Sequence, residues 1–334
     1  MDKWFALPEA RRIEILQTAS GLKGIPVDAI EKDWWVTATL KAVFELPVAE
    51  HMVFKGGTSL SKAWGVIQRF SEDIDLAVSR DFLGFSGTLS NEKVKALKKA
   101  SCQYVSVNLL ADLETQMEKM GIPADQFKIE AQELKDNESD RDPQQLNVFY
   151  KSIVSQSGYL KDKVVIEVGA RSELEPSEIR TITTLISEAI PAFKTDLTFD
   201  VLTVHPKRTF LEKLFLLHEE FQKPASKMRH YRMSRHLYDL EKLMDTAFGK
   251  EALDDTELYD SIIKHRQKFT PIKGIDYEKH QAKTLDFIPP SDVLSLWEDD
   301  YKLMVGAMIY GNSLRFEQLL ARMKELKTRF QIKS

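Results

Sequence analysis

The chain contains 334 residues, 43% of them hydrophobic and 29% charged, with a formal net charge of −4. This length predicts two domains rather than one, and the net charge argues against a globally cationic nucleic-acid binder. A single cysteine, Cys102, excludes an internal disulfide scaffold. No signal-peptide pattern opens the chain and no apolar run reaches membrane-spanning length, so we expect a cytoplasmic protein without a membrane partner.

The amino-terminal part of the chain is expected to be helical. Two helices are predicted at residues 9–22 and 28–46, and a short apolar strand follows at 52–54. Gly56 and Gly57 end this strand abruptly, and a glycine turn lets the backbone approach a ligand closely.

A short helix is predicted after the two glycines, with Thr58 or Ser59 as its N-cap and its end near Gln68. The free N–H groups and the positive dipole end at its start favour bound phosphate oxygens. The candidate nucleotide-binding residues are therefore Gly56, Gly57, Thr58 and Ser59.

Apolar and acidic residues alternate between residues 71 and 78, with the period of two that is typical of a β-strand. Asp73 and Asp75 would therefore share one face, with oxygens close enough to bind one cation. Magnesium, or manganese in its place, suits such a site because hard oxygen ligands and phosphates complete its coordination. Two close carboxylates would otherwise repel each other, which is a further reason to expect a counter-cation.

The middle of the chain predicts a mixed sheet. Residues 91–120 have a helical pattern that Ser90 is expected to cap. Strands are expected at 126–133, 146–153 and 163–168. The charged, proline-containing segment 134–145 has little to bury, which indicates a solvated loop.

From Phe199 onward the composition turns helical. Helices are expected at 207–221, 226–247, 254–268, 291–310 and 313–330, with an extended connection at 270–290. We place the domain boundary at Pro206. This gives a first domain of residues 1–205 and a helical second domain of residues 206–334.

A Gly-Gly pair alone is usually a turn, and Asp-x-Asp alone is usually a solvated strand face. Their conjunction, in the order strand, glycine turn, helix and acidic strand, resembles the first motif of the DNA polymerase beta superfamily of nucleotidyltransferases. FKGGTSLSKAW followed by RFSEDIDL is more narrowly similar to AbiEii/AbiGii-type nucleotidyltransferases, many of which are toxins of toxin–antitoxin or phage-defence systems. The resemblance also covers EKDWWVT at 31–37 and the segment 297–311, to which it assigns no role.

The resemblance implies an α+β fold in which a nucleotidyltransferase-like mixed sheet has flanking helices and a carboxy-terminal helical domain. In that family a lysine of the second motif faces the nucleotide phosphates, and TFLEKL assigns this role to Lys213. An aspartate of the third motif lies near the active site, and RHLYDL assigns it to Asp239, together with Arg235. Without the resemblance, Lys213 reads as a solvated lysine beside a core stripe and Asp239 as a helix-face partner of an Arg or Lys.

A nucleotidyltransferase site usually contains a third carboxylate from an adjacent strand. Glu167, in the otherwise apolar strand of residues 163–168, is the best candidate for a metal ligand or general base. The alternative is an edge-strand charge or an ion pair with Arg171. Glu130 is a weaker rival for the third carboxylate.

A basic stretch precedes Asp239 in the sequence and contains no acidic residue. It suggests an RNA-binding surface formed by Lys227, Arg229, Arg232 and Arg235. A solvated helix face is the alternative interpretation. We expect RNA, and tRNA in particular, as the acceptor, partly because some proteins with this resemblance modify tRNA ends.

These observations predict a metal-dependent enzyme that transfers a nucleoside monophosphate from a triphosphate (NTP) to RNA. The resemblance implies that it is a toxin restrained by a cognate antitoxin. A second interpretation keeps the chemistry but changes the acceptor to a protein hydroxyl or a small molecule. A third is a non-catalytic nucleotide-binding module, which need not retain Asp73, Asp75 and Lys213 together.

Overall fold

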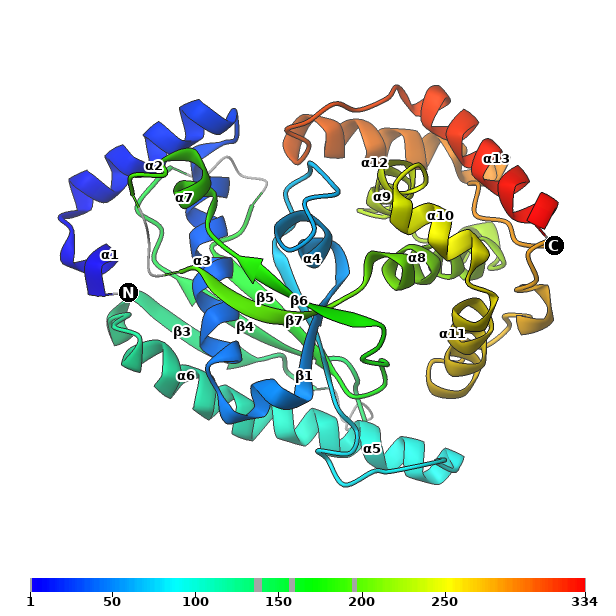
Figure 1. Ribbon diagram of the computed structural model, residues 1–334, viewed down its shortest axis with the longest axis horizontal. Coiled ribbons are helices and arrows are strands. Elements are labelled where there is room, and N and C mark those ends of the chain that lie inside the picture. Colours follow the sequence, from blue (N-terminus) through cyan, green and yellow to red (C-terminus); the bar gives the residue numbers. More distant parts are fainter. Residues whose placement is uncertain (1, 135–139, 156–159, 194–196, 334) are drawn as a thin grey trace. The chain divides into compact units, whose positions relative to one another are not determined.

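The computed structural model describes residues 2–134, 140–155, 160–193 and 197–333. The chain divides into two compact units (Figure 1). Unit 1 comprises Met1–Trp64 and Phe70–Val204, and unit 2 comprises Gly65–Arg69 and His205–Ser334.

Unit 1 is built on a seven-stranded sheet with the strand order β3-β4-β5-β2-β1-β7-β6. The strands are β1 (Met52–Lys55), β2 (Asp73–Val78), β3 (Phe127–Ala131), β4 (Gln144–Tyr150), β5 (Lys163–Gly169), β6 (Ser177–Ile182) and β7 (Phe199–Val204). β2 runs parallel to β5 and β1 runs parallel to β7, whereas the other neighbouring pairs are antiparallel. The predicted α+β fold with a mixed sheet is therefore confirmed.

Helices cover the apolar face of this sheet (Figure 1). The helices of unit 1 are α1 (Asp2–Ala6), α2 (Glu9–Lys23), α3 (Val27–Phe44), α4 (Gly56–Lys62), α5 (Asn91–Gln103), α6 (Leu110–Lys119) and α7 (Leu185–Ala189). α3 contacts β2, β5 and α6, while α5 contacts β5 and α6 contacts β3. Ile74, Leu76 and Val78 of β2 are buried, as expected for the face of the strand that meets the core.

Unit 2 is helical. Its helices are α8 (Pro206–Phe221), α9 (Arg235–Leu243), α10 (Ala247–Asp254), α11 (Thr256–Phe269), α12 (Leu294–Ala307) and α13 (Phe316–Lys333). The segment Gly65–Arg69 belongs to this unit because Arg69 forms a β-bridge with Ile309, and Gln68 accepts hydrogen bonds from the backbone N–H groups of Tyr310 and Gly311.

Several predicted elements are confirmed. The helices expected at 9–22 and 28–46 correspond to α2 and α3, and the strands expected at 126–133 and 163–168 correspond to β3 and β5. The Ser90 hydroxyl caps α5 by accepting a hydrogen bond from the Lys93 N–H. A π-helix, η2 (Tyr104–Leu109), interrupts the helix that was expected to continue to residue 120.

The predicted helix from Thr58 or Ser59 to Gln68 was wrong at both ends. α4 begins at Gly56, whose φ of +79° a glycine adopts without strain, and it ends at Lys62. Gly65, with φ +63°, then redirects the chain into unit 2.

Other predicted elements also differ from the structure. The helix expected at 226–247 is limited to α9, because Arg232 adopts a left-handed φ of 58° and Asp300 binds the backbone N–H groups of Arg232 and Ser234. β6 was not predicted, and β7 occupies residues that were assigned to the helical part. In the predicted loop 134–145, Gln144 and Gln145 belong to β4, while 135–139 lie outside the described residues.

Among the residues that the structure describes, no helix is both long enough and apolar enough to cross a membrane.

Candidate functional site

The two aspartates of β2 lie on one face of the sheet. In the pairing with β5, Asp73 lies opposite Val165 and Asp75 lies opposite Glu167. Residues two apart on a strand share a face, and residues directly opposite each other share it as well. Asp73, Asp75 and Glu167 therefore project from the same side of the sheet, opposite the buried Ile74 face.

Gly56 packs directly against the carboxyl group of Asp75. A β-carbon added at Gly56 would lie 1.9 Å from Asp75 Oδ2 and 2.7 Å from its Cγ, well inside any tolerated contact. The φ of +79° also disfavours a side chain at this position. Glycine is therefore required twice over, once by the turn and once by the neighbouring carboxylate.

The oxygen donors of this region fit a divalent ion that binds together with a triphosphate. Among the described residues, no group of three or more His, Cys, Asp and Glu side chains is gathered closely enough to hold a metal. Magnesium, however, is usually held by one or two carboxylates, and substrate phosphates and waters complete its octahedron. The pair Asp73 and Asp75 matches this mode of binding.

Glu167 has a hydrogen-bonded position on β5, where its Oε1 accepts from Gln145 Nε2 at 2.5 Å. Arg171, the alternative partner considered for it, has its Nε 3.6 Å from Asp142 Oδ2. Glu130 is exposed on β3 and pairs with Lys128 at 2.5 Å. Glu167 lies directly opposite Asp75 on the neighbouring strand, whereas Glu130 lies opposite Asn147 of β4. Glu167 is therefore the better candidate for the third carboxylate.

The hydroxyl groups of Thr58 and Ser59 point inward. Thr58 Oγ1 donates to the Asp73 carbonyl oxygen, and Ser59 Oγ donates to the Gly56 carbonyl oxygen at 2.9 Å. Both side chains are fully buried. Phosphate contacts from this turn would therefore come from backbone N–H groups, while Thr58 ties α4 to the start of β2.

Lys213 and Asp239 form a buried ion pair within unit 2. Lys213 Nζ lies 2.9 Å from Asp239 Oδ2, and Asp239 is completely buried. Arg69 binds the same carboxylate through two hydrogen bonds, from Nε at 2.7 Å and from Nη2 at 2.8 Å. Arg69 and Asp239 thus form a bidentate guanidinium–carboxylate pair, which connects the Gly65–Arg69 segment to α9. Lys213 of α8 binds the same carboxylate.

Burial would raise the pKa of Asp239, but the charges of Arg69 and Lys213 prevail and hold this pKa below its usual value. Burial lowers the pKa of Lys213 despite the nearby Asp239. His236 Nδ1 lies 3.5 Å from Lys213 Nζ. Burial lowers the pKa of His236 well below the ordinary value, which keeps the imidazole ring neutral at pH 7. The cluster therefore brings two basic side chains, Arg69 and Lys213, to one buried carboxylate.

Arg69 was not among the residues predicted for the site. The available signal was its position, four residues before Asp73 in the RFSEDIDL motif. Its partner Asp239 lies 170 residues away in the sequence, a separation that no local pattern reveals.

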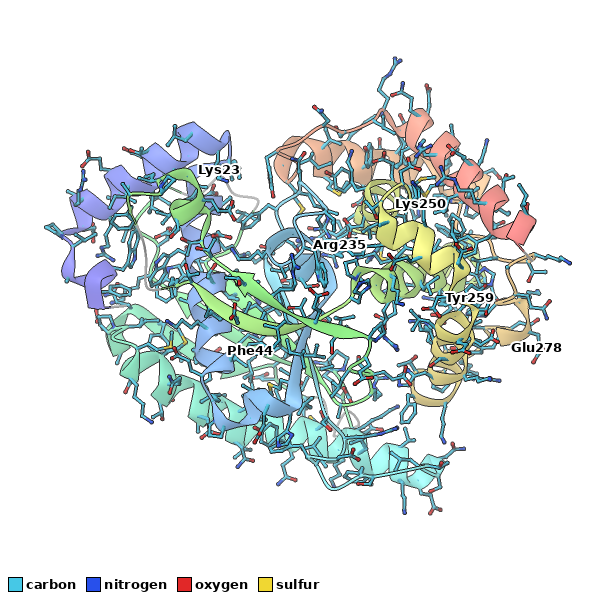
Figure 2. All side chains as sticks on the ribbon, viewed as in Figure 1. Lys23, Phe44, Arg235, Lys250, Tyr259 and Glu278 are labelled. Carbon is cyan, nitrogen blue, oxygen red and sulfur yellow. The ribbon has the colours of Figure 1, made fainter. Side chains whose placement is uncertain are left out.

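The predicted basic surface is more neutral than its sequence suggests. Glu220 Oε2 pairs with Lys223 Nζ at 2.8 Å and with Arg229 Nη2 at 2.8 Å. Lys227 is exposed, and Tyr231 is 72% exposed. Arg235 begins α9 and is labelled in Figure 2.

An open surface pocket of about 730 Å³ lies elsewhere in unit 2. It is lined mainly by charged residues of α10 and the start of α11, and it contains none of the predicted site residues.

The family profile described as "Nucleotidyl transferase AbiEii toxin, Type IV TA system" matches residues 39–322. The chain belongs to this family. It is accordingly a nucleotidyltransferase, the toxin of a type IV toxin–antitoxin system, with an NTP as substrate and an antitoxin as partner.

A solved structure agrees with this assignment at the level of the fold. MenT4, a nucleotidyltransferase toxin from Mycobacterium tuberculosis, aligns with a TM-score of 0.51 and 18% sequence identity, covering 97% of this chain and 89% of that one. No curated protein matches the chain.

Proposed function

We propose that the protein transfers a nucleoside monophosphate from an NTP to an RNA acceptor, tRNA in particular, with Asp73 and Asp75 holding a magnesium ion. The observation that carries this proposal is the packing of Gly56 against Asp75. It places a glycine turn, which can approach phosphates, directly beside one of two carboxylates on the same strand face.

A divalent ion bound there supplies positive charge that offsets the triphosphate. The backbone of Gly56 and Gly57 receives phosphate oxygens. Glu167 accepts the proton of the acceptor hydroxyl, whose oxygen forms a bond to the α-phosphorus. The bond from that phosphorus to the β-phosphate oxygen breaks, and pyrophosphate leaves. Positioning and electrostatics supply most of the catalysis in such reactions.

Lys213 is proposed to neutralise the leaving pyrophosphate. The position of Lys213 beside a second basic side chain, Arg69, supports this role, because Lys and Arg side chains bind phosphate oxygens through charge-assisted hydrogen bonds. Asp239 is fully buried between two cations, so its part is to hold Lys213 in place.

The RNA acceptor is proposed to bind the basic surface of Lys227, Arg229, Arg232 and Arg235, with the exposed Tyr231 available to stack on a base. Exchanging Arg229 and Arg232 for glutamate should weaken RNA binding and flatten its salt dependence. Because Arg229→Glu also removes a partner of Glu220, Lys227→Glu is the cleaner single variant. Unchanged RNA affinity after glutamate substitution at Arg229, Arg232 and Lys227 would exclude this surface from the proposed RNA-binding site.

The decisive assay incubates the purified protein with each radiolabelled NTP, magnesium and total RNA. Label in tRNA-sized RNA, lost in Asp75→Asn, supports the proposal. Label in a protein band or in a small molecule would instead support the second interpretation, and no label with any acceptor class would support a binding module.

Phage defence is proposed as the biological role of the toxin. Cells that carry the toxin with its antitoxin should form fewer phage plaques than cells that carry Asp75→Asn in its place. Equal plaque counts would contradict this role.

A further inference from the structure

Helix α3 carries charged side chains at buried positions, where an unpaired charge would destabilise the fold. Every residue from Asp28 to Leu40 is buried, and Glu31, Lys32 and Asp33 are each no more than 4% exposed. Charged groups removed from water destabilise a fold unless they are paired and hydrogen-bonded. These three consecutive residues begin the EKDWWVT motif, and the proposed reaction gives them no role.

Lys32 binds Glu72, the residue that precedes Asp73. Its Nζ forms a buried ion pair with Glu72 Oε2 and donates a hydrogen bond to the Lys161 carbonyl oxygen at 3.0 Å. Glu72 is covalently next to Asp73. Lys32 therefore fixes the start of β2 from the helix-covered side of the sheet.

Asp33 is bound to the end of α4. Its Oδ1 accepts from Lys62 Nζ at 2.5 Å, and its Oδ2 accepts from the Leu185 N–H at 2.7 Å. Burial raises the pKa of Asp33 even with Lys62 beside it. Lys62 is the last residue of the short helix that begins at Gly56.

The two anchored segments are also tied to each other. The Thr58 hydroxyl of α4 donates to the Asp73 carbonyl oxygen of β2. Consecutive residues of an α-helix project about 100° apart, so Lys32 and Asp33 reach two different segments from one rigid helix. These contacts link α3, α4 and β2 to one another, and α4 and β2 carry Gly56 and Asp75.

We propose that Lys32 and Asp33 are positioning residues that hold the glycine turn and the Asp73–Asp75 strand at the spacing needed for nucleotidyl transfer. This inference rests on the proposed function. Directional ion pairs fix the two segments more narrowly than apolar contacts would, and a misplacement of about 1 Å can cost roughly 100-fold in rate.

The test separates positioning from stability. Lys32→Met leaves Glu72 buried without its cation, whereas Lys32→Met with Glu72→Leu removes both charges and should regain stability. Asp33→Asn with Lys62→Met applies the same design to the second anchor and keeps an acceptor for the Leu185 N–H. We expect both double variants to unfold near the wild-type denaturant concentration, yet to show kcat lowered about tenfold or more and a higher magnesium requirement.

Glu31→Gln is the matched control. This neighbouring buried carboxylate accepts from Ser152 Oγ and, at 2.9 Å, from the Ile153 N–H, which belong to neither anchored segment. It should lose stability and keep the wild-type kcat. Wild-type kcat and magnesium dependence in both double variants would overturn the proposal, as would an equal loss of kcat in Glu31→Gln.

Calorimetric binding of manganese with a non-hydrolysable NTP gives a readout that does not depend on the acceptor. Weaker binding in the double variants, with the Glu31→Gln affinity unchanged, supports positioning even where the wild type labels no RNA. A wild-type protein that binds the nucleotide but labels no RNA would count against the proposed acceptor alone. Wild-type affinity in both double variants would contradict the positioning role.

Discussion

Replacing Gly56 with alanine would push a methyl group into the Asp75 carboxylate. The added β-carbon would lie 1.9 Å from Oδ2, whereas a close carbon–oxygen contact is about 3.3 Å, so the carboxylate would have to move by about 1.4 Å. A displacement of this size at a reacting centre is expected to lower kcat by about 100-fold or more. The left-handed φ adds a stability cost of about 1–2 kcal/mol.

Gly24→Ala provides the matched control for this prediction. Gly24 has φ +65° at the end of α2, and the space around its missing β-carbon is open. This variant should therefore show a similar loss of stability in urea unfolding and no loss of transfer rate. Steady-state transfer of labelled NMP measures the difference. A Gly56→Ala enzyme with wild-type kcat would refute the argument that this contact places the carboxylate.

Three further outcomes follow from the described contacts. Glu167→Gln should lower kcat in the transfer assay while Glu130→Gln leaves it unchanged, and equal rates would reject Glu167 as the base. Asp239→Asn removes the anion that Lys213 and Arg69 share, and it should lower the free energy of unfolding in urea by about 3–5 kcal/mol. A decrease of less than about 1 kcal/mol would contradict the buried pairing. Burial raises the pKa of Asp142 to about 6, so the folded protein retains a proton that the unfolded chain loses from about pH 4, and stability should fall as the pH rises from 4 to 6. Asp142→Asn should make that slope shallower, and an unchanged slope would assign it to other groups.

The sequence predicted the local secondary structure around Asp73 and Asp75 correctly. The alternation around Asp73 and Asp75 is a property of consecutive residues, and the structure confirms that both lie on one strand face. The same holds for the Ser90 cap and for α3, whose signals also lie within one turn or one helix.

The errors arose where distant contacts decide the structure. The predicted helix extended to about Gln68, but the segment Gly65–Arg69 instead pairs with residues near Ile309 in unit 2. The helix expected at 226–247 is shortened where Asp300, from α12, accepts hydrogen bonds from the backbone N–H groups of Arg232 and Ser234. Neither partner can be inferred from a local hydrophobic period.

The roles of charged residues also depended on partners distant in sequence. Arg69 meets Asp239 across 170 residues, and Lys32 meets Glu72 across 40. A pattern search treats each of these charges as a surface residue. Their burial is visible only once the helices and the sheet are assembled.

The most direct test of the account is a calorimetric titration of magnesium and a non-hydrolysable NTP into the wild type and into Asp73→Asn with Asp75→Asn. The account predicts saturable, magnesium-dependent binding to the wild type and its loss in the double variant, with the unfolding curve preserved. Equal magnesium-dependent affinity in both proteins, or no binding to either, would contradict the claim that these two carboxylates hold the metal-bound triphosphate.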